Sequence, residues 1–174
     1  LALGRTIARK GFHLLIDAYA QLASLDRPVP KLVIAGEGKE LENLKRQAAP
    51  LGNRVLFTGL VQNADKRYLL QHCRFMAAPS LEESFGNVAL EAMACSKPVI
   101  ASNTSGFAEI VQDAENGLLV EPNNVSALAQ ALQTYLKEDL TRPSQAAGRT
   151  AQAFSWPSIA QRYLSLINAL RNGV

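Results

Sequence analysis

The sequence predicts an α/β fold in which a doubly wound, six-stranded parallel sheet carries helices on both faces. Short apolar runs alternate with helical patterns from one end of the 174-residue chain to the other. Strands that alternate with helices pair in parallel through right-handed crossovers. Six such strands suggest the strand order 3-2-1-4-5-6, which places strands 1 and 4 side by side where the winding of the sheet reverses.

The strand pattern begins with the apolar run Leu1–Leu3, which is typical of the end of a strand. The chain opens there without a methionine, so we expect it to be part of a longer protein. Apolar side chains at helical spacing over residues 12–22 predict a helix with one core-facing stripe. Further strands are expected at residues 31–35, 54–58, 75–78, 98–102 and 117–120. Further helices are expected at residues 41–48, 64–72, 87–95, 108–112, 125–136, 141–152 and 155–172.

Prolines and apolar stripes define several of these boundaries. Pro79 stops the strand at 75–78, and Pro98 can start the next strand without breaking a ladder of hydrogen bonds. The final helix also carries an apolar stripe. Its members are Ile159, Tyr163, Leu166, Ile167 and Leu170.

Composition excludes several classes of protein. With 48% hydrophobic and 19% charged residues, the chain is neither disordered nor collagen-like, and no apolar run approaches the roughly 18 residues of a membrane span. A net charge of +3, scattered along the chain, does not favour a nucleic-acid partner. His13 and His72 are too isolated for a metal site, so neither a metal nor a cofactor is expected. Cys73 and Cys95 lack CxxC spacing and are expected to be buried thiols in a cytoplasmic protein.

The loop at residues 4–11 follows the first strand and carries three cations within six residues: Arg5, Arg9 and Lys10. Ligands of open parallel sheets bind beyond the carboxyl ends of the strands where the winding reverses, which is where this loop is expected. Arginine offers a planar fork to phosphate oxygens, and lysine offers a compact charge. The pattern favours a phosphate site, although a solvated basic loop would look the same.

The second unusual loop follows the fourth strand at residues 79–88 and leads into a helix that is apolar nearly all round. Gly86 and Asn87 mark the start of this helix, where free backbone N–H groups can receive an anion or a hydroxyl oxygen. Glu83 lies one turn earlier and projects into the same space. Glu91, the one charge on the helix, is either a satisfied structural glutamate or a carboxylate that awaits the hydroxyls of a ligand.

Glycine-containing turns end the second and third strands at the same edge of the sheet. Gly36–Gly38 and Gly59–Val61 are explained by turn geometry alone, or they reach a nucleoside attached to phosphates held in the first two loops. The segment 105–110, with Gly106 and Glu109, is balanced in the same way between a simple turn and a ligand role.

Together these motifs resemble the C-terminal, donor-binding domain of the family-four retaining glycosyltransferases. The resemblance rests on Arg5 and Lys10 in a GRxxxxKG frame, and on Glu83 and Glu91 inside PSxxExFGxxxxEAMA. KPVIAS, GxxEIV and NGLLV follow in the same order, so the resemblance covers nearly the whole chain. Such enzymes have the glycosyltransferase B fold, in which two Rossmann-like domains face each other across a cleft, and they need no metal for chemistry.

The resemblance implies a role for each matching residue. Arg5 and Lys10 would hold the donor diphosphate and neutralise the leaving group. Glu91 would accept hydrogen bonds from the ribose, and Glu83 would contact the transferred sugar, which makes Glu83, Arg5 and Lys10 the implied catalytic set. The implied donor-binding residues are Arg5, Lys10, Gly36, Glu37, Leu60, Glu83, Ser84, Phe85, Gly86, Asn87, Val88 and Glu91.

The resemblance also implies what the whole protein does. Residues 1–174 would form a single nucleotide-sugar-binding domain that lacks its N-terminal acceptor domain, and residues 155–172 would pack toward that missing half. The parent would transfer a hexose-type sugar from a UDP-, GDP- or ADP-linked donor to a glycan or glycolipid, in cell-envelope or polysaccharide biosynthesis. It would work in the cytoplasm, where peripheral association with a membrane is compatible with the sequence, and this chain alone would bind the donor without turnover.

Two departures from the family pattern and two other functions are weighed against this prediction. Ser96 stands where glycine is usual and is expected to affect only a turn. Phe107 replaces a second glycine and is expected to alter contacts near the sugar or acceptor, which weakens the case for Glu109. The alternatives are a nucleotide-sugar epimerase or hydrolase of the same fold, and a non-catalytic interaction module with a degenerate pocket.

Overall fold

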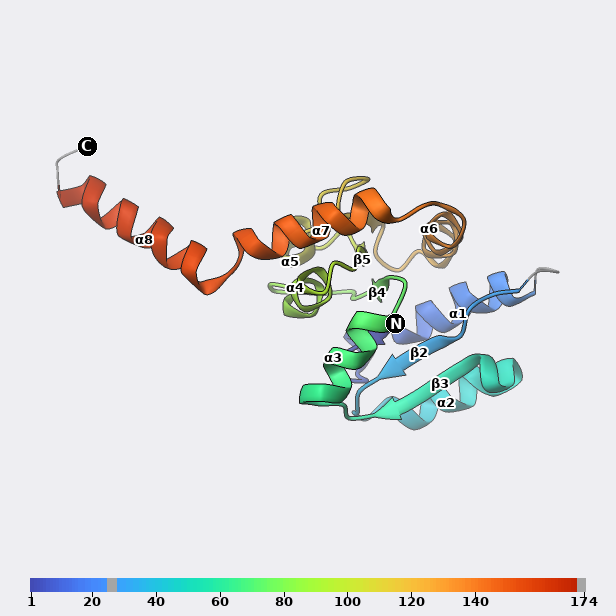
Figure 1. The fold of residues 1–174 in the computed structure, drawn as a ribbon. Helices are drawn as coiled ribbons and strands as arrows, with labels where there is room; N and C mark the ends of the chain where they lie inside the picture. Colours follow the sequence, from blue (N-terminus) through green and yellow to red (C-terminus); the bar gives the residue numbers. More distant parts are fainter. Residues whose placement is uncertain (25–27, 172–174) are drawn as a thin grey trace.

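The computed structural model describes residues 1–24 and 28–171, and these residues form two three-stranded parallel sheets (Figure 1). The first sheet has the order β1-β2-β3 and the second the order β4-β5-β6. The bounds of the strands are β1 Ala2–Leu3, β2 Leu32–Ala35, β3 Val55–Gly59, β4 Met76–Ala78, β5 Val99–Ser102 and β6 Gly117–Val120. The predicted α/β class and the parallel pairing are therefore confirmed.

The two sheets meet along β1 and β4. The backbone N–H of Ala77 donates to the carbonyl of Leu1 at 2.8 Å, and the amine of Leu1 donates to the carbonyl of Phe75 at 3.2 Å. These contacts do not amount to a continuous ladder, because β1 has only two residues. The single six-stranded sheet that the sequence predicts is thus found, within the described residues, as two sheets of three strands.

The helices alternate with the strands, as predicted. Their bounds are α1 Phe12–Ala23, α2 Leu41–Ala48, α3 Asn63–His72, α4 Asn87–Ala94, α5 Ser105–Ala108, α6 Val125–Lys137, α7 Thr141–Ala153 and α8 Trp156–Arg171, with 3-10 turns η1 Ala8–Lys10 and η2 Ala49–Arg54. The prediction for residues 108–112 was wrong, since α5 begins at Ser105 and ends where that helix was expected to begin. The helix includes Gly106 and buries Phe107, so the glycine lies inside a turn of helix and does not end one.

Neighbouring residues of one strand enter different hydrophobic clusters. Ile34 and Ile100 pack in the cluster that contains α1 and α6, whereas Ala35 and Ala101 pack in the cluster that contains α4 and parts of α5 and α7. Successive strand residues point to opposite faces, so these two clusters lie on opposite sides of the sheets. Helices therefore cover both faces, and the carboxyl ends of the strands stay open between them.

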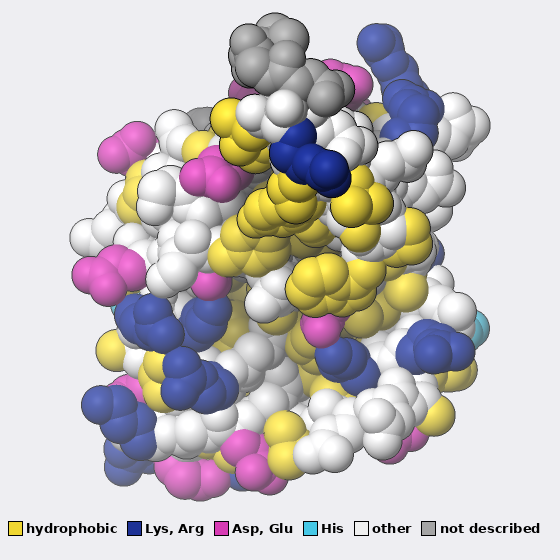
Figure 2. Space-filling view, turned by 90° about the vertical axis from the view of Figure 1, so that its left-hand side faces the viewer, with side chains coloured by type: hydrophobic (Ala, Val, Ile, Leu, Met, Phe, Trp, Pro, Cys, Tyr) yellow, Lys and Arg dark blue, Asp and Glu magenta, His cyan; other side chains and the backbone are white. Residues whose placement is uncertain are grey.

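Helix α8 leaves this body and extends away from it (Figure 1). It has no buried residue among those described, so its apolar stripe does not face a core within this part of the chain. Its large exposed apolar residues are Trp156, Tyr163, Leu164, Leu166, Ile167 and Leu170. Figure 2 views the side toward which α8 extends and shows hydrophobic side chains gathered over the upper part of this face. Asn172, the predicted end of the helix, lies outside the described residues.

None of the described helices has both the length and the apolar character needed to cross a bilayer.

Candidate functional site

The loop after β1 is held by backbone contacts to the loop after β2. The N–H of Gly4 donates to the carbonyl of Ala35 at 3.0 Å, and the N–H of Thr6 donates to the carbonyl of Glu37 at 2.9 Å. Gly36 has φ +141°, and a Cβ there would lie 1.8 Å from the carbonyl oxygen of Gly4. The path of the cationic loop is therefore set by main-chain groups and by a position that only glycine can occupy.

The same loop touches the one that follows β4. The N–H of Leu81 donates to the carbonyl of Arg9 at 2.7 Å, and a Cβ on Gly11 would lie 1.9 Å from the carbonyl oxygen of Pro79. Gly11 is left-handed, with φ 67°, and connects η1 to α1. The two stretches that the sequence singles out therefore lie against each other at the adjoining ends of β1 and β4.

Lys10 and Glu83 join these two loops through an ion pair. The Nζ atom of Lys10 lies 2.5 Å from Oε2 of Glu83, and each side chain is 14% exposed. A carboxylate so poorly hydrated needs a charged partner, and Lys10 provides it. These two predicted catalytic residues are thus brought together, although they are 73 positions apart in the sequence.

A hollow of about 310 Å³ gathers most of the other predicted binding residues. The predicted residues that line it are Arg5, Gly36, Glu37, Leu60, Val88 and Glu91. They come from the ends of β1, β2 and β3 and from α4, and Arg5 and Leu60 are exposed. Ser84, Phe85, Gly86 and Asn87 do not line this hollow but form the adjoining start of α4, where Gly86 is buried and the other three are exposed.

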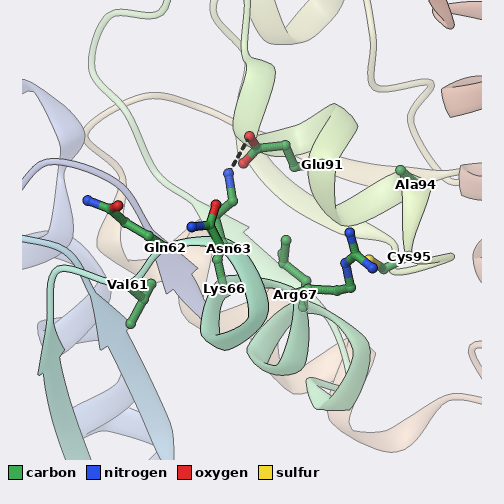
Figure 3. Close-up of a pocket in the computed structure, with 9 residues that line it drawn as sticks. Val61, Gln62, Asn63, Lys66, Arg67, Glu91, Ala94 and Cys95 are labelled. Carbon is green, nitrogen blue, oxygen red and sulfur yellow. Dashed lines mark hydrogen bonds and ion pairs between the residues drawn. The ribbon is translucent and has the colours of Figure 1, made fainter.

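Glu91 already has a partner, which the sequence did not reveal. Its Oε1 atom accepts a hydrogen bond from Nζ of Lys66 on α3 at 2.7 Å (Figure 3). The side chain of Glu91 is 37% exposed and, of the two alternatives for this residue, the pair with Lys66 fits a glutamate already satisfied within the fold. Helix α4 buries Ala89, Ala92 and Met93 and turns Glu91 toward α3. Lys66 lies one turn before the buried Leu70, a spacing that would have placed it on the inward face of α3.

A second hollow, of about 450 Å³, lies between α3 and α4 on the other side of this ion pair (Figure 3). It shares Val61, Lys66 and Glu91 with the first hollow, so the two adjoin at this ion pair. Gln62, Asn63 and Arg67 add polar and cationic groups to its walls. The site therefore extends from the cationic loop, past Glu91, to the start of α3.

The loop before α4 is supported from beneath by α5. The N–H of Gly106 donates to the carbonyl of Glu83 at 3.1 Å. Gly86 has φ +99°, and a Cβ there would lie 2.7 Å from the ring of Phe107. Phe107 is fully buried and its ring packs under the loop, so an effect of this residue on contacts near the sugar or acceptor would act through the loop. Glu109 is exposed.

The remaining motif residues stabilise the fold around the site. Asn116 of NGLLV is fully buried, where its amide donates to the carbonyl of Ile110 and to the hydroxyl of Thr150. Ser96 adopts the left-handed conformation, with φ 55°, which explains why glycine is usual at this turn. Both cysteines are free thiols, as predicted, but they are half-buried and not buried. The described residues contain no cluster of three or more His, Cys, Asp and Glu side chains suited to a metal.

The fold and the site together define a class of protein. Cations at the end of one parallel strand face carboxylates at the end of the next, beside a hollow of about 310 Å³, on an α/β domain with helices on both faces. This is the arrangement of a nucleotide-sugar-binding domain of a glycosyltransferase with the glycosyltransferase B fold. Residues 1–153 match the family described as Glycosyl transferases group 1, and the chain belongs to that family.

Curated relatives agree with this assignment. The chain is 38% identical over 184 residues to a D-inositol 3-phosphate glycosyltransferase of Jonesia denitrificans, covering 97% of this chain and 42% of the relative. It is 36% identical over 159 residues to a phosphatidyl-myo-inositol mannosyltransferase of Mycobacterium leprae, covering 90% of this chain and 42% of that protein. The chain thus spans less than half the length of these relatives.

Solved structures show the same relation. The Anabaena protein Alr3699/HepE in complex with UDP-glucose superposes with a TM-score of 0.80 at 31% identity, over 97% of this chain and 48% of that one. The C-terminal domain of the group 1 glycosyl transferase LpcC from Francisella tularensis superposes with a TM-score of 0.77 at 26% identity, over 88% of this chain and 84% of that domain.

Proposed function

We propose that this chain is the donor-binding, C-terminal half of a retaining, metal-independent hexosyltransferase. The observation that carries the proposal is the convergence of two loops distant in sequence, seen in the Lys10–Glu83 ion pair and in the hollow shared by Arg5 and Glu91. The UDP-glucose bound by the similar Anabaena protein supports a nucleoside-diphosphate sugar as the ligand.

The donor would lie along the hollow from the cationic loop toward α3. Arg5 and Lys10 hold the diphosphate, with the backbone N–H groups of residues 84–88 at the start of α4 as further donors. Glu91 accepts hydrogen bonds from the ribose hydroxyls, and Glu83 accepts them from the sugar. Glu37 and Leu60, at the ends of β2 and β3, flank the base, and Gly36 allows it a close approach.

The two ion pairs would exchange partners when the donor binds. In the free protein Lys10 is neutralised by Glu83 at 2.5 Å and Lys66 by Glu91 at 2.7 Å. A diphosphate attracts Lys10, and sugar hydroxyls replace the ammonium group as donors to Glu83. Ribose hydroxyls replace Lys66 at Glu91 in the same way. Each carboxylate therefore keeps a hydrogen-bonding partner throughout.

The chemistry would follow from charge placed at the leaving group. As the bond between the sugar and the diphosphate breaks, negative charge grows on the phosphate oxygen, where Arg5 and Lys10 stabilise it. This is the electrostatic role that a divalent ion plays in other transferases. The sugar passes through an oxocarbenium-like state, assisted by the departing phosphate, and is transferred with its anomeric configuration retained.

The missing half would supply the acceptor, so this chain would bind the donor without turnover. The 84% coverage of the Francisella C-terminal domain and the 42% coverage of full-length relatives support this division. We propose that the exposed stripe of α8, over residues 156–171, packs toward the absent N-terminal domain. We also propose that both sheets act as one unit of strand order 3-2-1-4-5-6, which the hydrogen bonds between Leu1, Phe75 and Ala77 support.

The substrates would be a hexose on UDP, GDP or ADP and a glycan or glycolipid acceptor in cell-envelope or polysaccharide biosynthesis. The mannosyltransferase from Mycobacterium leprae, which acts on a phosphatidyl-inositol, supports a hexose and a lipid-linked acceptor. A cytoplasmic location is proposed from the two free thiols, with peripheral contact to a membrane through the absent half.

A thermal-shift panel with UDP, GDP, ADP and their sugars tests this function, because a ligand that binds only the folded state raises the unfolding temperature. We expect one nucleoside diphosphate and its sugar to stabilise the chain and the corresponding nucleoside to do so much less. A flat response to every member of the panel would contradict donor binding. Transfer of sugar to an acceptor by this chain alone would contradict the division of labour between two halves.

A further inference from the structure

The loop at residues 82–86, from which α4 starts, rests on supports from two different parts of the chain. Two of them belong to α5: the Gly106 N–H bonded to the Glu83 carbonyl at 3.1 Å, and the Phe107 ring beneath Gly86. The third is Phe154, whose ring meets Phe85 edge to face, with centroids 6.3 Å apart and planes at 69°. Such aromatic pairs are attractive beyond the area that they bury.

Phe154 differs from the other supports because it lies where α7 ends and α8 leaves the body of the protein. The chain turns a corner at this junction, where hydrogen bonds hold the backbone. The Phe154 N–H donates to the carbonyl of Thr150 at 3.3 Å, and the hydroxyl of Ser158 on α8 donates to the carbonyl of Gln152 at 2.9 Å. Helix α8 has no described residue that is buried, so its orientation is set through this corner. Phe154 lies at this corner, between the end of α7 and the loop that carries Phe85.

We infer that Phe154 is a positioning residue for the donor loop. It holds the ring of Phe85, and through Phe85 it positions the backbone N–H groups at the start of α4. The position of these N–H groups therefore depends on the orientation of α8. The inference rests on the proposed function and goes beyond it, because it couples donor binding to the C-terminal helix. Phe85 is 40% exposed, so without Phe154 its ring has much less to pack against. Coupling of this kind is reciprocal, so donor binding also shifts the junction.

The chain contains its own reporter of the junction. Trp156 is the only tryptophan in the sequence and the first residue of α8, two positions after Phe154, and it is 84% exposed. Its fluorescence emission therefore reports on the corner, and no labelling is needed.

The test combines calorimetry with Trp156 emission while UDP is added to the chain. UDP is expected to bind the unaltered chain and to change the emission of Trp156. Phe154→Ala is expected to weaken UDP binding roughly two- to tenfold, the range that one aromatic pair supports, and to abolish the emission change. Phe154→Tyr keeps the ring and is expected to keep both properties. Tyr163→Ala, which removes an exposed aromatic ring from α8 away from the corner, is the matched control and is expected to behave like the unaltered chain.

A double-mutant cycle gives a second measurement in case Phe154→Ala fails to fold. Phe85→Leu, Phe154→Leu and the double variant are expected to weaken UDP binding non-additively, because the two rings act as a pair. Additive effects, or a Phe154→Ala chain that binds UDP as tightly as the unaltered chain with its emission change intact, would overturn the inference. If the unaltered chain binds none of UDP, GDP and ADP, the proposed function itself fails, and the inference fails with it. If it binds one of them with no change in Trp156 emission, only the coupling is refuted.

Discussion

Replacement of Lys10 by methionine isolates the electrostatic part of the site. Methionine keeps an unbranched side chain of similar length and removes the charge. In the free protein Lys10 pairs with Glu83 at 2.5 Å, and each side chain is 14% exposed. The variant therefore removes the proposed contact to the donor diphosphate and also leaves Glu83 without its counter-charge. Both effects act against an anionic ligand.

The magnitude follows from these two effects. A hydrogen bond to a charged group contributes about 1.5–3 kcal/mol, which corresponds to a rise in the Kd for UDP of roughly 10- to 150-fold. Lys10 must leave Glu83 to reach the diphosphate, and the loss of that ion pair offsets part of the gain. The expected rise in the Kd for UDP is therefore toward the lower end of this range. In Lys10→Met the charge of Glu83 is no longer neutralised and repels the anionic ligand, which raises the Kd for UDP again. The double variant Lys10→Met with Glu83→Gln is therefore expected to bind UDP more tightly than Lys10→Met alone.

Calorimetry with two ligands is the assay. UDP contains the diphosphate and uridine does not, so Lys10→Met is expected to weaken UDP binding while it leaves uridine binding nearly unchanged. Lys45→Met is the matched control, because Lys45 forms a surface pair with Glu42 at 2.8 Å on α2. That pair is exposed, and its loss is expected to change stability by less than about 1 kcal/mol and UDP affinity not at all.

Two results would refute this reasoning. If Lys10→Met binds UDP as tightly as the unaltered chain, Lys10 does not contact the diphosphate. If uridine and UDP lose affinity equally, Lys10 acts by holding the fold of the loop and not through charge at the phosphates.

Three further predictions concern the ribose contact, the loop support and the alkaline limit of stability. Glu91→Gln is expected to weaken UDP binding by no more than about tenfold, since the carboxylate is partly exposed, and to leave pyrophosphate binding unchanged; equal losses in the two titrations would contradict a ribose contact. Gly106→Ala places a Cβ 2.5 Å from the backbone nitrogen of Phe85, so we expect the free energy of unfolding to fall by about 1–3 kcal/mol and UDP binding to weaken. A variant with the stability and the UDP affinity of the unsubstituted chain would argue against a tight support. Burial raises the pKa of Tyr135 above its ordinary value of 10.0, so above that pH the unfolded chain loses a proton that the folded chain retains, and stability falls as the pH rises. Unfolding temperatures measured from pH 8 to pH 11 are expected to fall less steeply in Tyr135→Phe, and parallel curves would refute this contribution.

The strand and loop pattern was predictable because its signals are local. The sixth strand was expected at residues 117–120 and is found there, since a glycine and a following proline-containing turn bound a short apolar run. The two site loops were predicted to converge from topology alone, because the carboxyl ends of neighbouring parallel strands share one edge. The ion pair of Lys10 and Glu83 is the outcome of that convergence.

Lys66 was missed because its role depends on a contact between two helices that no local pattern specifies. The sequence shows a glutamate on an apolar helix and leaves its partner open, while the partner lies 25 positions earlier on α3. The predicted position of α5 was wrong for a related reason. Gly106 is usual in a turn, and only the close approach of Glu83 and Phe85 explains a glycine inside a helix.

The conformation of the loop that carries Arg5 and Lys10 is set by main-chain hydrogen bonds and by glycines that lie close to neighbouring carbonyl groups. The charged side chains of the loop contribute little to its backbone conformation. A scaffold of this kind can exchange its recognition chemistry without refolding. On the proposed function, substitutions at Arg5 and Lys10 would change which anion the loop binds and with what affinity, while the surrounding fold stayed the same.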